Sequence, residues 1–243
     1  AAFAGADGVR YTGSFGDPRD PADDVAVLEL RGLYAHADVE VTGDRIGGEG
    51  PVDHGAYFRP LRIPFEPFED NQVTVTCHAP RDRFGGLHDT GMVPEEEAVP
   101  GIWWGASLES RPLPYIENID VRPEVTADGA TLHLRTTVVA DGPIEDRVTY
   151  SVRPAGDTNS RGTMQRGSVE TDGPGKTVLE HTVEIRDPEL WWPRELGRQS
   201  RYTIRGKLGD DAHTVTTGVC EIGFEDGQLR GNGESLPIRG VNL

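Results

Sequence analysis

The stretch DPELWWPRELG (residues 187–197), followed by the run RYTIRGKL (residues 201–208), decides the fold. Residues 201–208 alternate between apolar and polar side chains, which is the pattern of a half-buried strand. Trp191 and Trp192 are flanked by two prolines, so they cannot lie inside a helix, and in an extended or turn conformation their rings point to different sides. Either both rings lie in the core, or one enters the local core while the other meets a neighbouring domain.

The composition favours a turn-rich, all-β protein. The chain has 243 residues, of which 35% are hydrophobic, 31 are Gly and 18 are Pro. That length suits one large domain or two of ordinary size, each with a proper core. No apolar run approaches the length needed to cross a bilayer, so we expect a soluble protein with no membrane partner.

The charge points to a halophilic source. The net charge is −17, and Lys176 and Lys207 are the only lysines among 24 basic residues. Acids spread along a chain that is poor in lysine are expected where high salt reduces the Debye length to about 3 Å or less. Such a surface repels nucleic acid, so no nucleic-acid partner is expected. Residues 1–7 lack the basic start of a signal peptide, which predicts a cytoplasmic protein.

Cysteine and histidine spacing predicts neither a bridge nor a cofactor. Cys77 and Cys220 each lie in an apolar, strand-like pattern, which favours two buried thiols in different domains over one disulfide. The seven histidines include no His-x-His or His-x-x-x-His pair, and no Gly-x-Ser-x-Gly occurs. The sequence therefore signals neither a metal site nor a serine hydrolase triad.

The first 112 residues predict a jelly-roll-like β-sandwich. Short runs with period-two alternation are divided by Gly, Pro and Asp, as in half-buried antiparallel strands. They cover residues 9–12, 25–30, 37–41, 61–65 and 71–77. Thr42-Gly43-Asp44-Arg45 predicts a tight hairpin. The Gly-rich residues 43–50 lack the Gly-Lys-Ser/Thr ending of a phosphate loop.

A long acidic loop follows at residues 81–100. It has no periodicity and contains the triplet Glu95-Glu96-Glu97. Long loops in compact β domains are often functional, and a carboxylate triplet can hold a general acid or Ca²⁺. In so acidic a protein it is also the composition of an ordinary solvated face.

Residues 113–225 predict an immunoglobulin-like sandwich. Arg111-Pro112-Leu113-Pro114 is a stiff boundary, because two prolines interrupt any strand ladder. Regularly spaced strands are then expected. They cover residues 115–121, 130–139, 147–152, 177–185, 200–208 and 212–224. Residues 226–243 contain a short polar hairpin and then a strand-like start, which suggests a chain cut at the entry to another domain.

Several segments, taken in order, resemble glycoside hydrolase family 2, the β-galactosidase, β-glucuronidase and β-mannosidase family. Residues 101–109 resemble the Gly-Ile-Trp segment that closes its sugar-binding sandwich. The other similar segments are ADVEVTG (37–43), HGAYFRP (54–60), LWWP (190–193) with Tyr202, IGF (222–224) and RGVN (239–242). The last is similar to the first strand of the family's catalytic barrel.

The resemblance implies a parent enzyme that is a retaining β-glycosidase. In this family both catalytic carboxylates come from barrel strands beyond residue 243, so the chain itself carries no catalytic residue and is expected to be inactive alone. Its sandwich lends residues to the active site from the hairpin near Thr42 and from the loop before Gly-Ile-Trp. The implied substrate-binding residues are Glu95, Glu96, Thr42 and Trp103, acting on a β-glycoside without a cofactor or metal.

Two alternatives remain open from the residues. A freestanding carbohydrate-binding module presents exposed aromatic rings to sugars, and Tyr57, Trp103 and Trp104 are the candidates. A tandem β-sandwich interaction protein of the cell surface is the other. Neither alternative accounts for Arg239-Gly240-Val241-Asn242 at the end of the chain.

Overall fold

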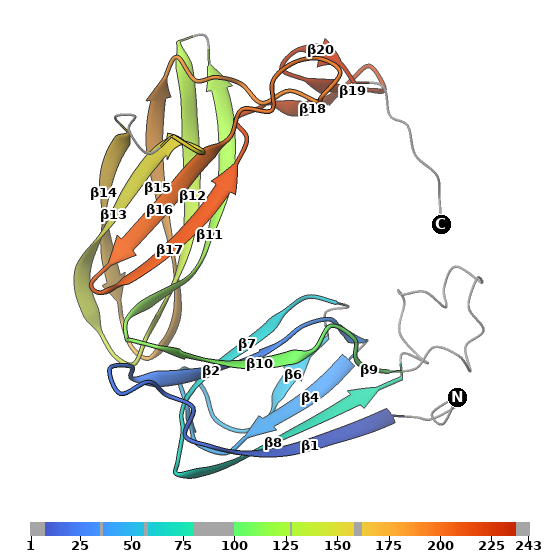
Figure 1. Ribbon diagram of the computed structural model, residues 1–243, viewed down its shortest axis with the longest axis vertical. Helices are drawn as coiled ribbons and strands as arrows, with labels where there is room; N and C mark the ends of the chain where they lie inside the picture. The colour runs from blue at the N-terminus through green and yellow to red at the C-terminus, as the bar shows by residue number, and fades with distance from the viewer. Residues whose placement is uncertain are drawn as a thin grey trace. The chain divides into compact units, whose positions relative to one another are not determined.

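The computed structural model of the protein (Figure 1) describes residues 8–34, 36–55, 58–79, 100–126, 128–157 and 162–236. All regular elements in these ranges are strands, so the all-β prediction is confirmed. No helix within the described ranges has the length and apolar character to span a membrane. The chain divides into two compact units, Ala1–Leu113 and Pro114–Leu243.

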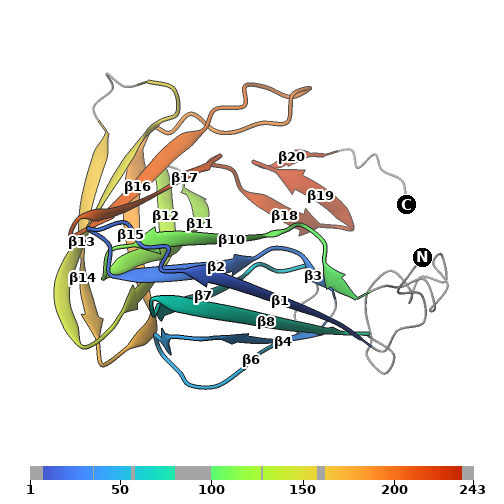
Figure 2. The same cartoon turned by 60° about the horizontal axis from the view of Figure 1, so that its bottom comes forward.

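The first unit contains two four-stranded sheets, with strand orders β1-β8-β4-β6 and β10-β2-β7-β5. Figure 2 shows β4 between β8 and β6. A short pair, β3 (Leu33–Tyr34) with β9 (Gly101–Ile102), lies beside them. The bounds of the eight strands, in sheet order, are β1 Gly8–Gly16, β8 Asp70–His78, β4 His36–Val41, β6 Val52–His54, β10 Ala106–Arg111, β2 Val25–Leu30, β7 Leu61–Glu66 and β5 Asp44–Arg45.

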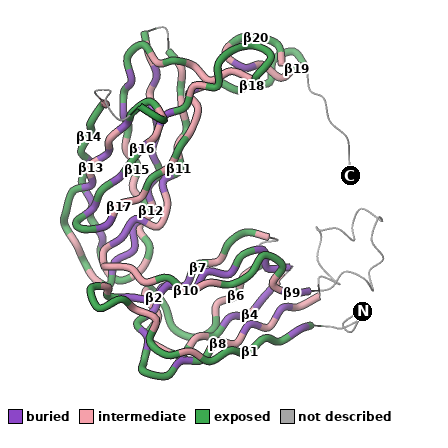
Figure 3. Tube along the Cα trace, viewed as in Figure 1, coloured by how far each residue is buried: buried purple, intermediate pink, exposed green. Residues whose placement is uncertain are grey.

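The core of the first unit follows the predicted alternation in β4, where Ala37 and Val39 are fully buried and their neighbours are partly exposed. Figure 3 shows the same alternation of buried and more exposed positions along β12 of the second unit. β2 departs from it, because all six of its residues are buried. Ala26, Leu28 and Leu30 belong to the core of the unit, and Val25, Val27 and Glu29 on the other face of β2 are buried as well.

The predicted hairpin at residues 42–45 is wrong. β4 belongs to one sheet of the sandwich, whereas β5 pairs with β7 in the other, so Thr42 and Gly43 carry the chain from sheet to sheet. Gly43 has φ of 108°, and a Cβ at this position would lie 2.5 Å from the carbonyl oxygen of Glu66. The turn residues marked a change of direction correctly, but turn chemistry alone does not distinguish a reversal from a crossing.

The second unit is a seven-stranded sandwich followed by a small hairpin sheet. Its sheets have the orders β11-β12-β15, β14-β13-β16-β17 and β18-β19-β20. The bounds are β11 Tyr115–Thr126, β12 Gly129–Ala140, β15 Gly175–Arg186, β14 Thr163–Thr171, β13 Ile144–Pro154, β16 Tyr202–Leu208, β17 Asp211–Thr217, β18 Ile222–Glu225, β19 Gln228–Gly231 and β20 Glu234–Ser235.

Two features of this unit differ from the sequence prediction. The single strand expected at residues 212–224 is two strands, because β17 ends at Thr217 and β18 begins at Ile222 in a different sheet. β14 was not predicted. Among the described strands it pairs with β13 alone, and its first four residues, which include Met164, are all exposed, so the alternation appears only near its end.

The double-tryptophan stretch lies between β15 and β16 in the chain. Hydrogen bonds connect it to β16 and to residues beside the terminal hairpin sheet. Trp191 and Trp192 are both only partly buried, so the alternative in which both rings lie in the core is wrong. The amide of Trp191 donates to the carbonyl of Val219, and its own carbonyl accepts from the side chain of Asn232. The Glu189 amide donates to the hydroxyl of Tyr202 in β16.

The two cysteines are free thiols, as predicted, but the prediction that both are buried is wrong for Cys220. Cys77 is buried in the first unit, and burial raises its pKa to about 11. Cys220 is partly exposed in the second unit, between β17 and β18 and not within a strand.

Candidate functional site

Four aromatic side chains gather beside the β3–β9 pair: Tyr34, Phe58, Trp103 and Trp104. The Phe58 ring stacks on Trp104 with centroids 5.2 Å apart and on Tyr34 with centroids 5.4 Å apart. Trp103 meets both Tyr34 and Phe58 edge to face, at 5.7 Å in each case. These separations are those of favourable aromatic pairs. We refer to the four residues as the aromatic cluster.

Backbone hydrogen bonds fix the aromatic cluster. The amides of Trp103 and Trp104 donate to the carbonyls of Gly32 and Arg31, at 3.0 and 3.2 Å, and Phe58 donates to Leu33 at 3.0 Å. Gly32 has φ of 59°, and a Cβ at this position would lie 2.7 Å from the Trp104 ring. Glycine is therefore required where the chain passes beneath that ring.

Phe58 adopts φ of 55°, a left-handed conformation that costs a bulky residue about 1–2 kcal/mol. Such strain is concentrated at functional sites, where the surroundings hold it in place. In the aromatic cluster the rings of Tyr34, Trp103 and Trp104 surround Phe58 and supply that restraint. The strain identifies the cluster as a site candidate.

Two rings of the aromatic cluster face solvent. Trp103 is 50% exposed and Trp104 is 62% exposed, whereas Tyr34 is buried. Trp103 is one of the residues that the sequence predicts to bind substrate, and the structure places it among these rings. Exposed aromatic faces offer apolar stacking area next to water, a chemistry that suits the apolar face of a sugar ring.

A buried carboxylate supports the backbone beneath Trp104. Glu29 of β2 is 5% exposed. It accepts hydrogen bonds from Arg31 at 2.6 Å and Arg62 at 2.7 Å. Burial alone raises the pKa of Glu29, but the two guanidinium partners outweigh it, so the pKa is lowered and the group stays ionised. Sequence reasoning missed this residue, although a lone acid in the apolar run VAVLEL was the available signal.

The other predicted binding residues are not part of the aromatic cluster. The hydroxyl of Thr42 accepts a hydrogen bond from the Gln72 amide at 2.6 Å and lies 3.3 Å from the Gln72 carbonyl, so it is engaged with β8. Glu95 and Glu96 lie outside the described residues, as does Tyr57.

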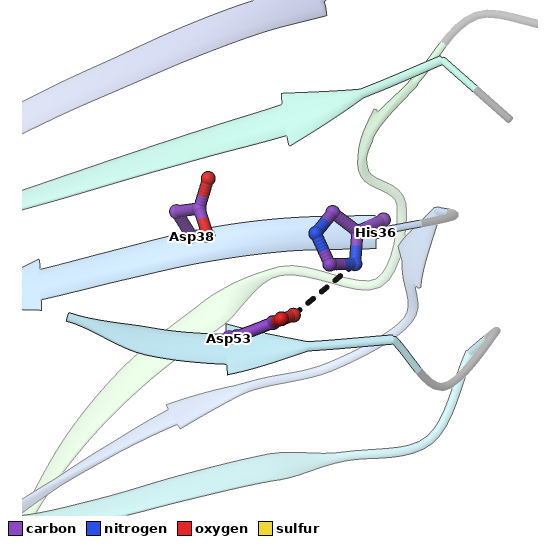
Figure 4. Close-up of side chains that lie close together, drawn as sticks. All are labelled: His36, Asp38 and Asp53. Carbon is purple, nitrogen blue, oxygen red and sulfur yellow. Dashed lines mark ion pairs between the residues drawn. The ribbon is translucent and has the colours of Figure 1, made fainter.

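A second cluster lies on the outer face of the β1-β8-β4-β6 sheet (Figure 4). His36 and Asp38 come from β4, Asp53 from β6 and His78 from β8. His36 Nδ1 lies 3.3 Å from Asp53 Oδ1, and His78 Nε2 lies 2.8 Å from Asp38 Oδ2. No sequence motif predicted this group. The His-x-Asp spacing of residues 36 and 38, which places both on one strand face, was the only local signal.

Comparison with known proteins identifies the relatives of the chain. Residues 114–224 match the family model described as glycosyl hydrolases family 2. This part of the chain, a little under half of it, is similar to glycoside hydrolase family 2. A solved structure with a similar fold is the β-glucuronidase of Bacteroides uniformis, with a TM-score of 0.70 and 16% identity over 96% of this chain and 29% of that one. The resemblance predicted from the sequence is confirmed.

Two named relatives extend the likeness. The β-galactosidase of Pseudoalteromonas haloplanktis is 28% identical over 155 residues, which is 58% of this chain and 14% of that protein. The exo-β-D-glucosaminidase of Hypocrea virens is 23% identical over 235 residues, which is 88% of this chain and 26% of that protein. The chain therefore spans about a quarter or less of the length of these relatives.

Proposed function

We propose that this chain is the non-catalytic, sugar-binding and spacer portion of a family 2 β-glycosidase that hydrolyses O-glycosidic bonds in a barrel domain outside these 243 residues. The observation that carries the proposal is the family match over residues 114–224, combined with alignment to only 14–26% of the relatives' length. These relatives are named for hydrolysis of β-glycosides, and most of their length lies outside the aligned part.

The carboxylates of the described residues support a non-catalytic role. Retaining hydrolysis needs two carboxyl groups about 5–5.5 Å apart, one protonated and one ionised. The buried carboxylates in the described ranges are Glu29 and Asp211, which belong to different units. Glu29 is held ionised by two arginines, and Asp211 accepts a hydrogen bond from the amide of Ile116 at 2.8 Å. Both act in structural contacts.

Within the proposal, the first unit contributes sugar contacts and the second acts as a spacer. Trp103 offers an exposed ring for stacking, while Thr42, Glu95 and Glu96 are proposed to hydrogen-bond sugar hydroxyls. The second unit has its own core of strand residues from both sheets. A sandwich with such a core is a rigid support that does not depend on a ligand.

The test compares the 243-residue chain with the complete product of the gene that encodes it. Both are assayed with chromogenic β-galactoside, β-glucuronide, β-mannoside and β-glucosaminide substrates in high salt. We expect hydrolysis of at least one substrate by the complete product and of none by the chain. Hydrolysis by the chain refutes the accessory role, and inactivity of the complete product on every glycoside refutes the parent activity.

A second candidate function is a freestanding carbohydrate-binding module. The exposure of Trp103 and Trp104 favours it. Calorimetric titration of the chain with oligosaccharides separates the two functions, because the module binds sugar by itself. The informative variant is Trp104→Ala, and its control is Phe68→Ala, which removes another exposed ring of the same unit, 53% exposed, outside the aromatic cluster. Binding that is lost only in the first variant supports the module.

We further propose a cytoplasmic location in a halophile. The net charge of −17 supports this source, because self-repulsion of the acids is screened only in concentrated salt. The midpoint of thermal unfolding is therefore expected to rise from dilute buffer to molar KCl. A midpoint that falls or stays constant contradicts the proposal.

A further inference from the structure

The outer face of the β1-β8-β4-β6 sheet concentrates metal-ligating side chains from three strands. In the strand register Asp38 lies opposite Asp53, and His36 lies opposite His78. The alternate residues of β4, Ala37 and Val39, point into the core, so the four side chains share the opposite face. Figure 4 shows the side chains of His36, Asp38 and Asp53 close together, with the ion pair between His36 and Asp53 drawn as a dashed line.

The spacing of these groups fits a metal ion. One ligand atom each of His36, Asp38 and Asp53 can be chosen so that all three lie within 4.8 Å of one another. A tetrahedral zinc ion with bonds of about 2.0–2.2 Å holds its ligand atoms about 3.3–3.5 Å apart. His36 Nδ1 and Asp53 Oδ1 are already 3.3 Å apart.

An unsatisfied polar atom points to a ligand at the same place. Within the part of the chain that the structure describes, the buried Nδ1 atom of His36 has no hydrogen-bond partner, and the side chain is only 12% exposed. Asp53 lies within ion-pair distance of this atom but not in hydrogen-bonding geometry. Buried polar atoms in proteins are paired in the large majority of cases, so an unpaired nitrogen that faces the Asp53 carboxylate calls for an explanation. A metal ion supplies one.

We infer that His36, Asp38 and Asp53 bind a divalent transition metal of the zinc type. An imidazole with two carboxylates suits zinc, whereas Ca²⁺ and Mg²⁺ prefer six or more oxygen ligands. His78 is a positioning residue, because its Nε2–H donates to Asp38 at 2.8 Å and orients that carboxylate. Three protein ligands leave the fourth position for water.

The metal clamps an edge strand that is otherwise weakly held. β6 has three residues and, among the described strands, pairs with β4 alone, through three residue pairs. A bond from Asp53 to a metal shared with β4 fixes this strand. His54, the last residue of β6, lies 3.1 Å from the carbonyl of Arg59 through its Nε2 atom. The clamp therefore restrains the segment that carries Phe58 of the aromatic cluster.

The test is calorimetric titration of the tag-free, chelator-treated chain with Zn²⁺, in the presence of millimolar Mg²⁺. We expect one tight site per chain, a rise in the thermal unfolding midpoint with Zn²⁺, and the visible absorption of tetrahedral cobalt when Co²⁺ replaces it. His36→Ala and Asp53→Asn are each expected to weaken binding at least about 100-fold, and His78→Gln about 10- to 100-fold.

The control variant is His133→Ala. His133 forms the same kind of pair, with Nε2 2.8 Å from Glu124 in the second unit. Among the described residues, no third metal-ligating side chain lies close to this pair. It is expected to bind Zn²⁺ as the unmodified chain does. His36→Gln provides a second, more conservative variant, with circular dichroism as the check of folding. Several weak sites that Mg²⁺ displaces, or equal losses in the His36 and His133 variants, overturn the inference.

Discussion

The substitution Gly43→Ala tests the crossing of the chain between the two sheets of the first unit. Gly43 has φ of 108°, and an added Cβ would meet the carbonyl oxygen of Glu66 at 2.5 Å. Gly50→Ala is the matched control. Gly50 has φ of 72° in the same unit, and its added Cβ has no neighbour within 4 Å. The control carries the cost of a positive φ without the collision.

The expected cost has two parts. A positive φ costs an L-residue about 1–2 kcal/mol, and both variants carry this cost. A Cβ at 2.5 Å from a backbone oxygen forces the strand end to shift, because the carbonyl of Glu66 is not a flexible side-chain tip. Overpacking of this kind costs about 1–3 kcal/mol. Gly43→Ala is therefore expected to destabilise the first unit by about 2–5 kcal/mol, against about 1–2 for Gly50→Ala.

The assay uses the buried thiol of Cys77 as a reporter of the first unit. Cys77 is fully buried, and its pKa is raised to about 11, so it reacts only when the unit opens. In a Cys220→Ser background, the labelling rate under native conditions gives the free energy of opening. The difference of about 1–3 kcal/mol between the variants corresponds to about 5- to 150-fold faster labelling of Gly43→Ala. Equal rates refute the crossing geometry.

Two further substitutions test other contacts. Glu29→Gln tests the pH dependence of stability. Because the pKa of Glu29 is lowered in the folded chain, its ionised form stabilises the first unit. This contribution to the free energy of unfolding is fully present above the unfolded pKa of about 4.3 and is lost as the pH falls through the folded pKa. Urea unfolding at a series of acidic pH values is expected to show a smaller loss of stability with falling pH in the variant than in the unmodified chain. Tyr150→Phe removes the bonds of the buried hydroxyl to Thr136 at 2.6 Å and His181 at 3.2 Å. The second unit is expected to lose about 1–3 kcal/mol, measured by urea unfolding.

The strands were predictable where one face is core and the other is solvent. β4, β7, β8 and β12 lie within one or two residues of the predicted ranges, because alternating Val, Ile, Leu and polar residues report a half-buried strand directly. β14 was missed because an edge strand leaves most of its first half in water and loses the alternation. The pattern therefore fails where both faces of a strand are open to solvent, whereas β2, which is buried on both faces, was located at residues 25–30.

Turns were located from the sequence but not assigned to a topology. Asp141-Gly142 marks the end of β12 correctly, yet the chain then enters β13 in the opposite sheet, as it does after Thr42 and Gly43. Gly and Asp permit the backbone conformation of a tight change in direction, whatever partner follows. Which strand the chain meets next depends on burial across the whole sandwich. That information is distributed over both sheets and cannot be obtained from four residues.

The dependence on strand pairing also explains which site residues could be predicted from the sequence. Trp103 was identifiable because its segment is contiguous, whereas its partner Phe58 reaches the aromatic cluster through a hydrogen bond to Leu33, 25 positions earlier in the chain. His36, Asp38 and Asp53 meet only because Asp38 is paired with Asp53 in the register of β4 and β6. A shift of that register by one residue turns Asp53 to the core face and dissolves the cluster. Sites on β-sandwiches are thus set by strand register, and the clamp on β6 matters because it holds that register at the sheet's weakest edge.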